Sequence, residues 1–397
     1  MKQRTLWSRR EFVQSIGCSS FAAAGLHVPW LTTSTQPSPR FAYVGFSRAA
    51  QEPTGVRVFA IRGERWTHVQ IVPSEHPTAL ALHPSQHFLY AVNEINSYQG
   101  LPLGTVEAYG IDPHDGHLTL LNRQPLSLSG TLPRHLAISP DGRNVVVALH
   151  GGGAYNVLPI GAGGMLGKVS GILKEVGSGP NQQHQEASHP QTVIFDTAGR
   201  HLLGADLGSD RLNVFALDGD KLSIRDRSVT QPGSGPRHMV LHPAGHLLYV
   251  ANHLEASLFC YGYDMANGKL RGQLHYQTLF RNGSAEMGLG ALAIHPSGQF
   301  LYASYRPAEP NRPSPEGIVA WRINPTTGAL TSIQLSTEES PCINTMTMLP
   351  DGTGLLALSL ECNSVVHLSI NPVSGRLGAA MQVAKVSAPI SLAVKYA

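Results

Sequence analysis

The sequence predicts an all-β fold, a seven-bladed β-propeller over about residues 41–397, and three observations lead to it. The chain is rich in turn formers, with 41 Gly and 28 Pro, and only 14% of its residues are charged. Two half-hairpins stand at the two ends of this region. Between them a two-stranded hairpin recurs six times, at steps of 46 to 57 residues. A repeat of this length built from short strands indicates radially arranged blades rather than a helical bundle.

The repeated hairpin is clearest in residues 235–255, GPRHMVLHPAGHLLYVANHLE. Two short apolar runs, His238–His242 and Leu247–Ala251, flank the turn signal Pro243–Gly245. In the six copies the residue before the turn is His83, Ser139, Asp196, His242, His295 and Leu349. We expect the three histidines among them to be turn and packing residues.

Two further strands are expected between successive hairpins, because apolar runs there flank turns such as Asp112–Gly116 and Asn324–Gly328. Each unit is therefore predicted to be a four-stranded antiparallel blade. Phe41–Gly45 resembles the second strand of a hairpin, and Pro389–Lys395 resembles the first. Pairing of these N- and C-terminal strands would complete the seventh blade and remove the exposed sheet edges.

Residues 1–31 are predicted to be a twin-arginine export signal. The segment Ser8–Phe12 reads SRREF, an apolar stretch Val13–Leu26 follows, and Ala22–Ala24 is a candidate cleavage site. The stretch is too short for a typical membrane span. The prediction is a periplasmic protein that uses the twin-arginine translocation machinery and keeps no stable span in its mature form. Cys18 is an alternative point of lipid attachment, and residues 32–40 are predicted to be a linker.

The charge pattern gives no sign of a nucleic-acid partner. The formal net charge is only +3, and no run of Lys or Arg interrupts the sequence. The cysteines suggest one structural feature. Cys342 and Cys362 fall almost opposite each other across the last hairpin, so a disulfide is possible there in an exported protein.

Polar residues are expected to meet at one mouth of the propeller channel. The first strand of each blade lines the channel, so the starts of first strands and the ends of second strands converge from distant parts of the sequence. Glu186, His189, Arg237 and His238 are the candidate catalytic residues, and His135, His184, Asp206 and Arg306 are the candidate substrate-binding residues. Further polar residues predicted at this mouth are Asn93, Glu94, His150, Asn252 and His253.

These residue types suit hydrolysis of an activated ester such as a lactone. Glu186 or a neutral imidazole could deprotonate water as a general base. Arg237 could hold a substrate anion or stabilise an oxyanion that develops on a carbonyl group. The sequence has no Gly-x-Ser-x-Gly motif, which argues against a serine nucleophile of that type.

Structural roles remain open for several of these residues. His135 and His238 could simply cap their strands, and Asp206 could brace its loop through Arg211. His184, Glu186 and His189 are potential metal ligands by type, but their spacing fits neither a helical pair nor a zinc finger. We therefore predict neither a metal nor a cofactor.

Four stretches, taken together and in order, resemble the propeller-type lactonase family, which includes the propeller 6-phosphogluconolactonases and the fungal carboxy-muconate lactonising enzymes. They are Tyr43–Gly45 with Gly55–Phe59, Pro133–His135 with Ser139–Gly142 and Gly151–Gly153, Gly179–His189 with Asp206–Arg211, and Gly235–His238 with Tyr249–Asn252. The resemblance covers essentially all of residues 41–397. It implies hydrolysis of a sugar-acid or related lactone, at a site formed by His135, Glu186, His189, Arg237 and His238.

The chain also departs from the pattern of similar family members. It has His184 where they usually carry Arg, Gln191 where they usually carry a second His, and Leu149–His150 where Asn-Tyr is usual. The missing Arg and the export signal argue against a phosphorylated substrate. Two other functions stay open: ring closure of an unsaturated acid by a carboxy-muconate-type lactonising cycloisomerase, and binding of an organic acid by a non-catalytic periplasmic propeller.

Overall fold

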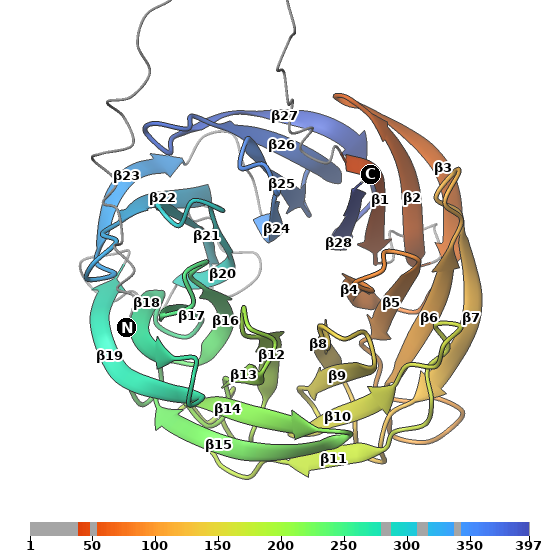
Figure 1. The fold of residues 1–397 in the computed structure, drawn as a ribbon, viewed down its shortest axis with the longest axis horizontal. Coiled ribbons are helices and arrows are strands. Elements are labelled where there is room, and N and C mark those ends of the chain that lie inside the picture. The colour runs from red at the N-terminus through yellow and green to blue at the C-terminus, as the bar shows by residue number, and fades with distance from the viewer. Residues whose placement is uncertain (1–38, 48–53, 279–286, 308–316, 337–342, 397) are drawn as a thin grey trace, which may run out of the picture. The chain divides into compact units, whose positions relative to one another are not determined.

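The computed structural model describes residues 39–47, 54–278, 287–307, 317–336 and 343–396. Within these ranges the regular elements are all strands, and they form seven four-stranded antiparallel sheets arranged around a centre (Figure 1). The all-β, seven-bladed prediction is confirmed. The expected export signal, most of the expected linker and Cys342 of the possible Cys342–Cys362 disulfide lie outside the described residues. Cys362 is described and is exposed.

The strands fall into four concentric positions from the channel outward. The inner strands are β4 (Pro77–Leu82), β8 (Pro133–Ile138), β12 (Pro190–Phe195), β16 (Pro236–Leu241), β20 (Met287–Ile294), β24 (Ile343–Met348) and β28 (Pro389–Tyr396). The second strands are β1 (Pro39–Phe46), β5 (Phe88–Asn93), β9 (Asn144–Leu149), β13 (His201–Asp206), β17 (Leu247–Asn252), β21 (Phe300–Pro307) and β25 (Gly354–Ser359).

The third and outermost strands complete each blade. The third strands are β2 (Gly55–Arg62), β6 (Thr105–Ile111), β10 (Ala154–Pro159), β14 (Arg211–Asp218), β18 (Ser257–Asp264), β22 (Gly317–Ile323) and β26 (Ser364–Ile370). The outermost strands are β3 (Arg65–Pro73), β7 (Leu118–Pro125), β11 (Gly171–Lys174), β15 (Lys221–Val229), β19 (Lys269–Thr278), β23 (Leu330–Ser336) and β27 (Leu377–Lys385).

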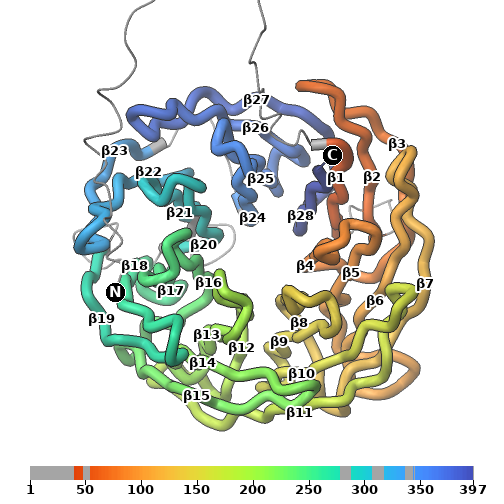
Figure 2. Tube along the Cα trace, in the orientation of Figure 1, coloured from red at the N-terminus to blue at the C-terminus, as the bar shows by residue number. Residues whose placement is uncertain are grey.

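The ring is closed by the two ends of the propeller chain. Strand β28 pairs with β1 in antiparallel register, with Ala42 opposite Val394 and Val44 opposite Leu392. Figure 2 shows the red strand β1 beside the dark blue strand β28. The predicted closure is confirmed. Strand β1 begins at Pro39, so it includes the last two residues of the expected linker.

Burial explains why the strands carry different residue patterns. The second strands have neighbouring blades on both faces, so β9 and β17 are almost continuously apolar and buried. The outer strands face solvent on one side, and β15 is exposed over much of its length. The hydrophobic clusters lie between adjacent blades: Tyr302 of β21 packs in one cluster with Leu355 of β25.

A β-bulge near the start of each inner strand adds one residue to it. In β8, for example, Pro133 pairs with Leu149 and His135 pairs with Ala148, which leaves Arg134 as the extra residue. A bulge re-aims the side chain of its extra residue. The equivalent extra residues in the other inner strands include Thr78, Gln191, Arg237 and Ile390.

At the opposite end of the inner strands, histidines join neighbouring blades. His83, His242 and His295 each place Nε2 at 3.0 Å from a carbonyl oxygen in the next blade, that of Gly142, Gly298 and Gly352 respectively. A carbonyl oxygen only accepts, so Nε2 donates in each case. We call these three histidines the rim histidines.

The described residues contain no helix long and apolar enough to cross a membrane.

Candidate functional site

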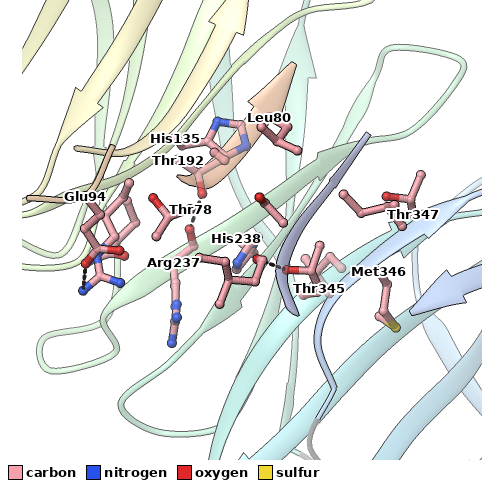
Figure 3. A pocket seen from close by; sticks show the side chains of 18 of the residues that line it. Thr78, Leu80, Glu94, His135, Thr192, Arg237, His238, Thr345, Met346 and Thr347 are labelled. Carbon is pink, nitrogen blue, oxygen red and sulfur yellow. Dashed lines mark hydrogen bonds and ion pairs between the residues drawn. The ribbon is translucent and has the colours of Figure 1, made fainter. Parts of the chain in front are cut away.

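Two connected cavities occupy one end of the channel. The mouth cavity, of about 310 Å³, lies between the residues that follow β9, β13 and β17 and those that precede β12. The channel cavity, of about 470 Å³, is lined by the inner strands themselves (Figure 3). Arg134, Gln191 and Arg237 line both cavities and so stand at their junction.

The bulges place these three junction residues. Arg134, Gln191 and Arg237 are the extra residues of β8, β12 and β16, which are consecutive blades. Ala291 of β20 and Ile390 of β28 line the other part of the channel cavity, close to the corresponding bulges. The same backbone device therefore presents charge and an amide on one side of the channel and apolar groups on the other.

Glu186 and His189 form a hydrogen-bonded pair on the wall of the mouth cavity. His189 Nδ1 lies 2.9 Å from the carbonyl oxygen of His150 and must donate to it. His189 Nε2 lies 3.0 Å from Glu186 Oε1, so this contact holds a proton between the two side chains. The side chain of Glu186 is 59% exposed, whereas that of His189 is 10% exposed. The pair thus offers an open carboxylate supported by a buried imidazole.

The environment of Glu186 favours its ionised form. A hydrogen bond from its own backbone N–H and the hydrogen bond with His189 both lower the pKa of this carboxyl group. An exposed carboxylate that stays ionised at neutral pH and faces a cavity can accept a proton from water.

His150 and Gln191 lie beside this pair. The ring of His150 stacks on that of His189, with 4.4 Å between the ring centroids and 27° between the ring planes. Gln191 Nε2 is 2.7 Å from His150 Nδ1. Burial, reinforced by the nearby positive charge of Arg134, lowers the pKa of His150 to about 3. His150 is therefore neutral at physiological pH.

Two guanidinium groups reach the junction, from the two blades that flank the blade of β12. Arg237 Nη1 lies 3.2 Å and 3.4 Å from the two ring nitrogens of His253. Arg134 Nη2 lies 2.9 Å from Glu94 Oε1, and Figure 3 marks this ion pair. Burial raises the pKa of Glu94, and the charges of Arg134 and Arg237 oppose that rise. Both guanidinium groups can donate hydrogen bonds to a ligand oxygen.

Asp206 is fully buried and belongs to the scaffold of the site. Its Oδ1 accepts the backbone N–H groups of His189, Gly208 and Ser209, and its Oδ2 accepts the hydroxyls of Ser188 and Ser209. It lines neither cavity. Of the two roles that the sequence leaves open for Asp206, a substrate contact and a brace for its loop, this position favours the second, because the carboxylate holds the loop that carries His189.

The other predicted site residues are divided between the two cavities. His184 lines the mouth cavity and is exposed. His135 and His238 line the channel cavity instead. Burial lowers the pKa of His135 to about 4, so it is a neutral group in the channel wall. Arg306 lies in β21, but its side chain is outside the described part of the chain.

No group of three His, Cys, Asp or Glu side chains in the described ranges is arranged to hold a metal ion. For the potential ligand His189, both ring nitrogens are already hydrogen bonded.

Two residues at the junction did not emerge from the sequence. The sequence marks Arg134 only as part of the Pro133–His135 motif, and Gln191 only as a departure from a family pattern. A repeated signal does exist, because β4, β8, β12 and β16 all begin with Pro and all have the bulge at the next residue. Aligning the copies on that proline would have selected both.

Comparison with known proteins shows the family. A family model described as lactonase, 7-bladed β-propeller, matches residues 41–394. The chain is 27% identical over 343 residues to a 6-phosphogluconolactonase of Formosa agariphila, covering 84% of this chain and 94% of that protein. It is 24% identical over 322 residues to a 6-phosphogluconolactonase of Bacillus subtilis, covering 81% and 87%.

Solved structures agree. A putative 6-phosphogluconolactonase of Bacteroides fragilis superposes with a TM-score of 0.79 at 25% identity, covering 91% of this chain and 99% of that one. A periplasmic gluconolactonase of Pseudomonas aeruginosa superposes with a TM-score of 0.76 at 24% identity, covering 90% and 99%, which shows a shared fold. The chain therefore belongs to the seven-bladed β-propeller lactonase family, and this membership supports lactone hydrolysis as its chemistry.

Proposed function

We propose that the protein hydrolyses a sugar-acid lactone at the junction of the mouth and channel cavities, with Glu186 and His189 activating water and Arg237 and His238 binding the substrate. One observation carries the proposal. The open carboxylate of the Glu186–His189 pair and the guanidinium group of Arg237 line the same cavity of about 310 Å³. A base and a cationic donor that face one space are the two groups that ester hydrolysis needs.

The proposed reaction conserves every proton. Glu186 takes a proton from water as the water oxygen bonds to the lactone carbonyl carbon. The carbonyl π electrons move onto oxygen, where Arg237 stabilises the negative charge. When the intermediate collapses, the bond from carbon to the ring oxygen breaks and that oxygen takes the proton held at His189 Nε2. The proton on Glu186 then returns to His189, which restores the pair and releases the hydroxy acid.

The charges around the site favour an unphosphorylated lactone. The two guanidinium groups at the junction, Arg134 and Arg237, are offset by the carboxylates of Glu94 and Glu186. A phosphate would add about 1.5 to 2 negative charges to a site with no large cationic excess. The curated relatives are named for a phosphorylated substrate, so both forms belong in the test.

The test is hydrolysis of a panel of lactones that includes glucono-δ-lactone and 6-phosphoglucono-δ-lactone. The release of acid measures the rate of hydrolysis. Glu186→Gln keeps the shape of the side chain and removes the base, so we expect kcat to fall about 10²-fold or more. Asp220→Asn is the matched control, because Asp220 is an exposed carboxylate in the turn between β14 and β15. Full activity of Glu186→Gln would refute the assigned base, and no turnover of any lactone by the unaltered protein would refute the function.

We also propose that the protein is exported through the twin-arginine pathway to the periplasm. The support is the sequence SRREF at residues 8–12 and the apolar stretch that follows it. In a bacterium with an active twin-arginine system, the unaltered protein should appear in the periplasmic fraction. The double substitution Arg9→Lys and Arg10→Lys should retain it in the cytoplasm. Export of the double variant at the same level would contradict the proposal.

A further inference from the structure

His150 organises the Glu186–His189 pair by two separate contacts. Its carbonyl oxygen accepts the Nδ1–H of His189, and its ring stacks on the ring of His189. It lies directly after β9, at the end of a buried strand, and lines the mouth cavity. Its side chain is therefore in direct stacking contact with the proposed proton-transfer pair and lines the same mouth cavity.

The hydrogen bond from Gln191 fixes the tautomer of His150. An amide nitrogen can only donate, so Gln191 Nε2 donates to His150 Nδ1 across 2.7 Å. Nδ1 then holds a lone pair, and the proton of the neutral ring sits on Nε2. Among the described residues, Nε2 of His150 has no hydrogen-bond partner. This nitrogen is also not among the polar atoms that are buried without a partner, so it is accessible to solvent. The Nε2–H group is thus a donor open to the cavity.

The neighbouring charges keep this donor neutral. Besides burial, the groups that lower the pKa of His150 are Arg134 on β8, His184 and His189 on the segment before β12, and Arg237 on β16. A neutral imidazole N–H can stabilise a developing oxyanion without giving up its proton. The proton transfers of the reaction would then be carried out by Glu186 and His189 alone.

We infer that His150 is a further catalytic residue, which donates Nε2–H to the substrate carbonyl oxygen alongside Arg237, and that Gln191 is a positioning residue that sets this tautomer. The inference rests on the proposed lactone hydrolysis. It gives a purpose to the amide at position 191, because a carboxylate there would accept a proton from Nδ1 and an apolar group would leave Nδ1 unpaired.

The first test needs no substrate. Nitrogen-15 NMR of the imidazole groups, with His150→Phe used to assign the signal, should show His150 protonated at Nε2 and unprotonated at Nδ1 from pH 5 to pH 8. In Gln191→Leu the proton should shift at least partly to Nδ1. A His150 ring that is protonated on Nδ1 in the unaltered protein, or that titrates near pH 6, would overturn the inference.

The second test uses the lactone on which the unaltered protein is most active. His150→Phe keeps an aromatic ring to stack on His189 and removes the donor, so kcat should fall about 10²-fold while KM changes little. His150→Gln restores an N–H donor and should recover part of that loss. His246→Ala, an exposed histidine at the other end of the channel, is the control.

The outcomes separate the two ideas. If the unaltered protein hydrolyses a lactone and His150→Phe keeps its full kcat, the inference is wrong and the proposed function stands. If the unaltered protein hydrolyses no lactone, the proposed function falls, and the inferred catalytic role of His150 falls with it. The kinetic comparison and the assignment of the His150 signal both require a folded variant, checked by its melting temperature, and His150→Gln serves both purposes if His150→Phe does not fold.

Discussion

Histidines occupy both ends of the inner strands, and the two groups differ in what surrounds their nitrogens. Each rim histidine donates Nε2–H to a backbone carbonyl of the next blade and accepts at Nδ1 the backbone N–H of the residue two positions on. At the mouth, about 20 Å away along a six-residue strand, His189 Nδ1 also has a backbone partner, the carbonyl oxygen of His150. The other contacts of His150 and His189 are with side chains: Gln191, Glu186 and each other.

This difference separates structural from chemical histidines. Backbone partners, joined by a serine hydroxyl at Nδ1 of His83 and of His295, occupy both nitrogens of each rim histidine and leave nothing for a ligand. Side-chain partners at the mouth fix tautomers and still leave the carboxylate of Glu186 and the Nε2–H of His150 facing a cavity. The position within the blade, rather than the residue type, therefore decides the role. Substitutions at the mouth should change activity, and substitutions at the rim should change stability.

The largest effect is expected at Arg237. Arg237→Ala removes a cationic donor from the junction of the two cavities, so kcat/KM should fall about 10²- to 10³-fold. The melting temperature should change by only about 2–3 °C, because the side chain is half-buried beside an open cavity. Steady-state kinetics and thermal unfolding measure the two quantities.

Arg143→Ala is the matched control for this prediction. Arg143 lies in the turn between β8 and β9, at the rim end, and its side chain is 82% exposed. Its loss should leave both activity and melting temperature almost unchanged. A large fall in the melting temperature of Arg237→Ala would show that Arg237 belongs with the structural residues.

Asp206 should break the simple division between mouth and rim. Asp206→Ala leaves three backbone N–H groups and two hydroxyls without their buried acceptor, which should cost about 3–5 kcal/mol in the free energy of unfolding. Activity should fall as well, since the loop carries His189. Asp206→Asn keeps one acceptor oxygen and should recover much of the stability in denaturant unfolding. If Asp206→Ala lost activity without losing stability, Asp206 would act on the substrate.

The sequence predicted the blades well and the mouth only in part, for a physical reason. Hairpins and turns are local, so repeats such as those around Pro243–Gly245 identify the strands, and the two half-hairpins identify the closure. A bulge is not visible in this way. One extra residue reverses which side chains face the channel, and this brings Arg134 and Gln191 to the junction. The hydrogen bonds that the buried carboxylate of Asp206 accepts depend on how the surrounding loop folds. An aspartate in the sequence does not reveal that conformation.

A smaller effect is expected when a single rim histidine is removed. His242→Ala leaves the carbonyl of Gly298 and the N–H of Ala244 without their partner, which should destabilise the protein by about 1–3 kcal/mol. The kcat/KM value should stay within about twofold, because the change is at the far end of the strand. His246→Ala removes an adjacent exposed ring and should do neither. A loss of activity in His242→Ala at full stability would contradict the comparison.

The smallest effect concerns pH and tests the neutral state of the rim. Burial lowers the pKa of His242 in the folded protein, whereas the unfolded chain titrates near the usual value of about 6.5. Below that pH the unfolded state binds more protons than the folded state, so the free energy of unfolding falls as the pH falls. One such site contributes at most about 1.4 kcal/mol per pH unit.

His242→Gln removes this site, so its stability should decline less steeply than that of the unaltered protein between pH 7 and pH 5. His135 and His150 also have lowered pKa values and act in the same direction, so part of the decline should remain in the variant. Denaturant unfolding at a series of pH values measures the difference between the two slopes. Parallel curves would mean that His242 changes its charge equally in the folded and unfolded states, and its bond to Gly298 would then not depend on a neutral ring.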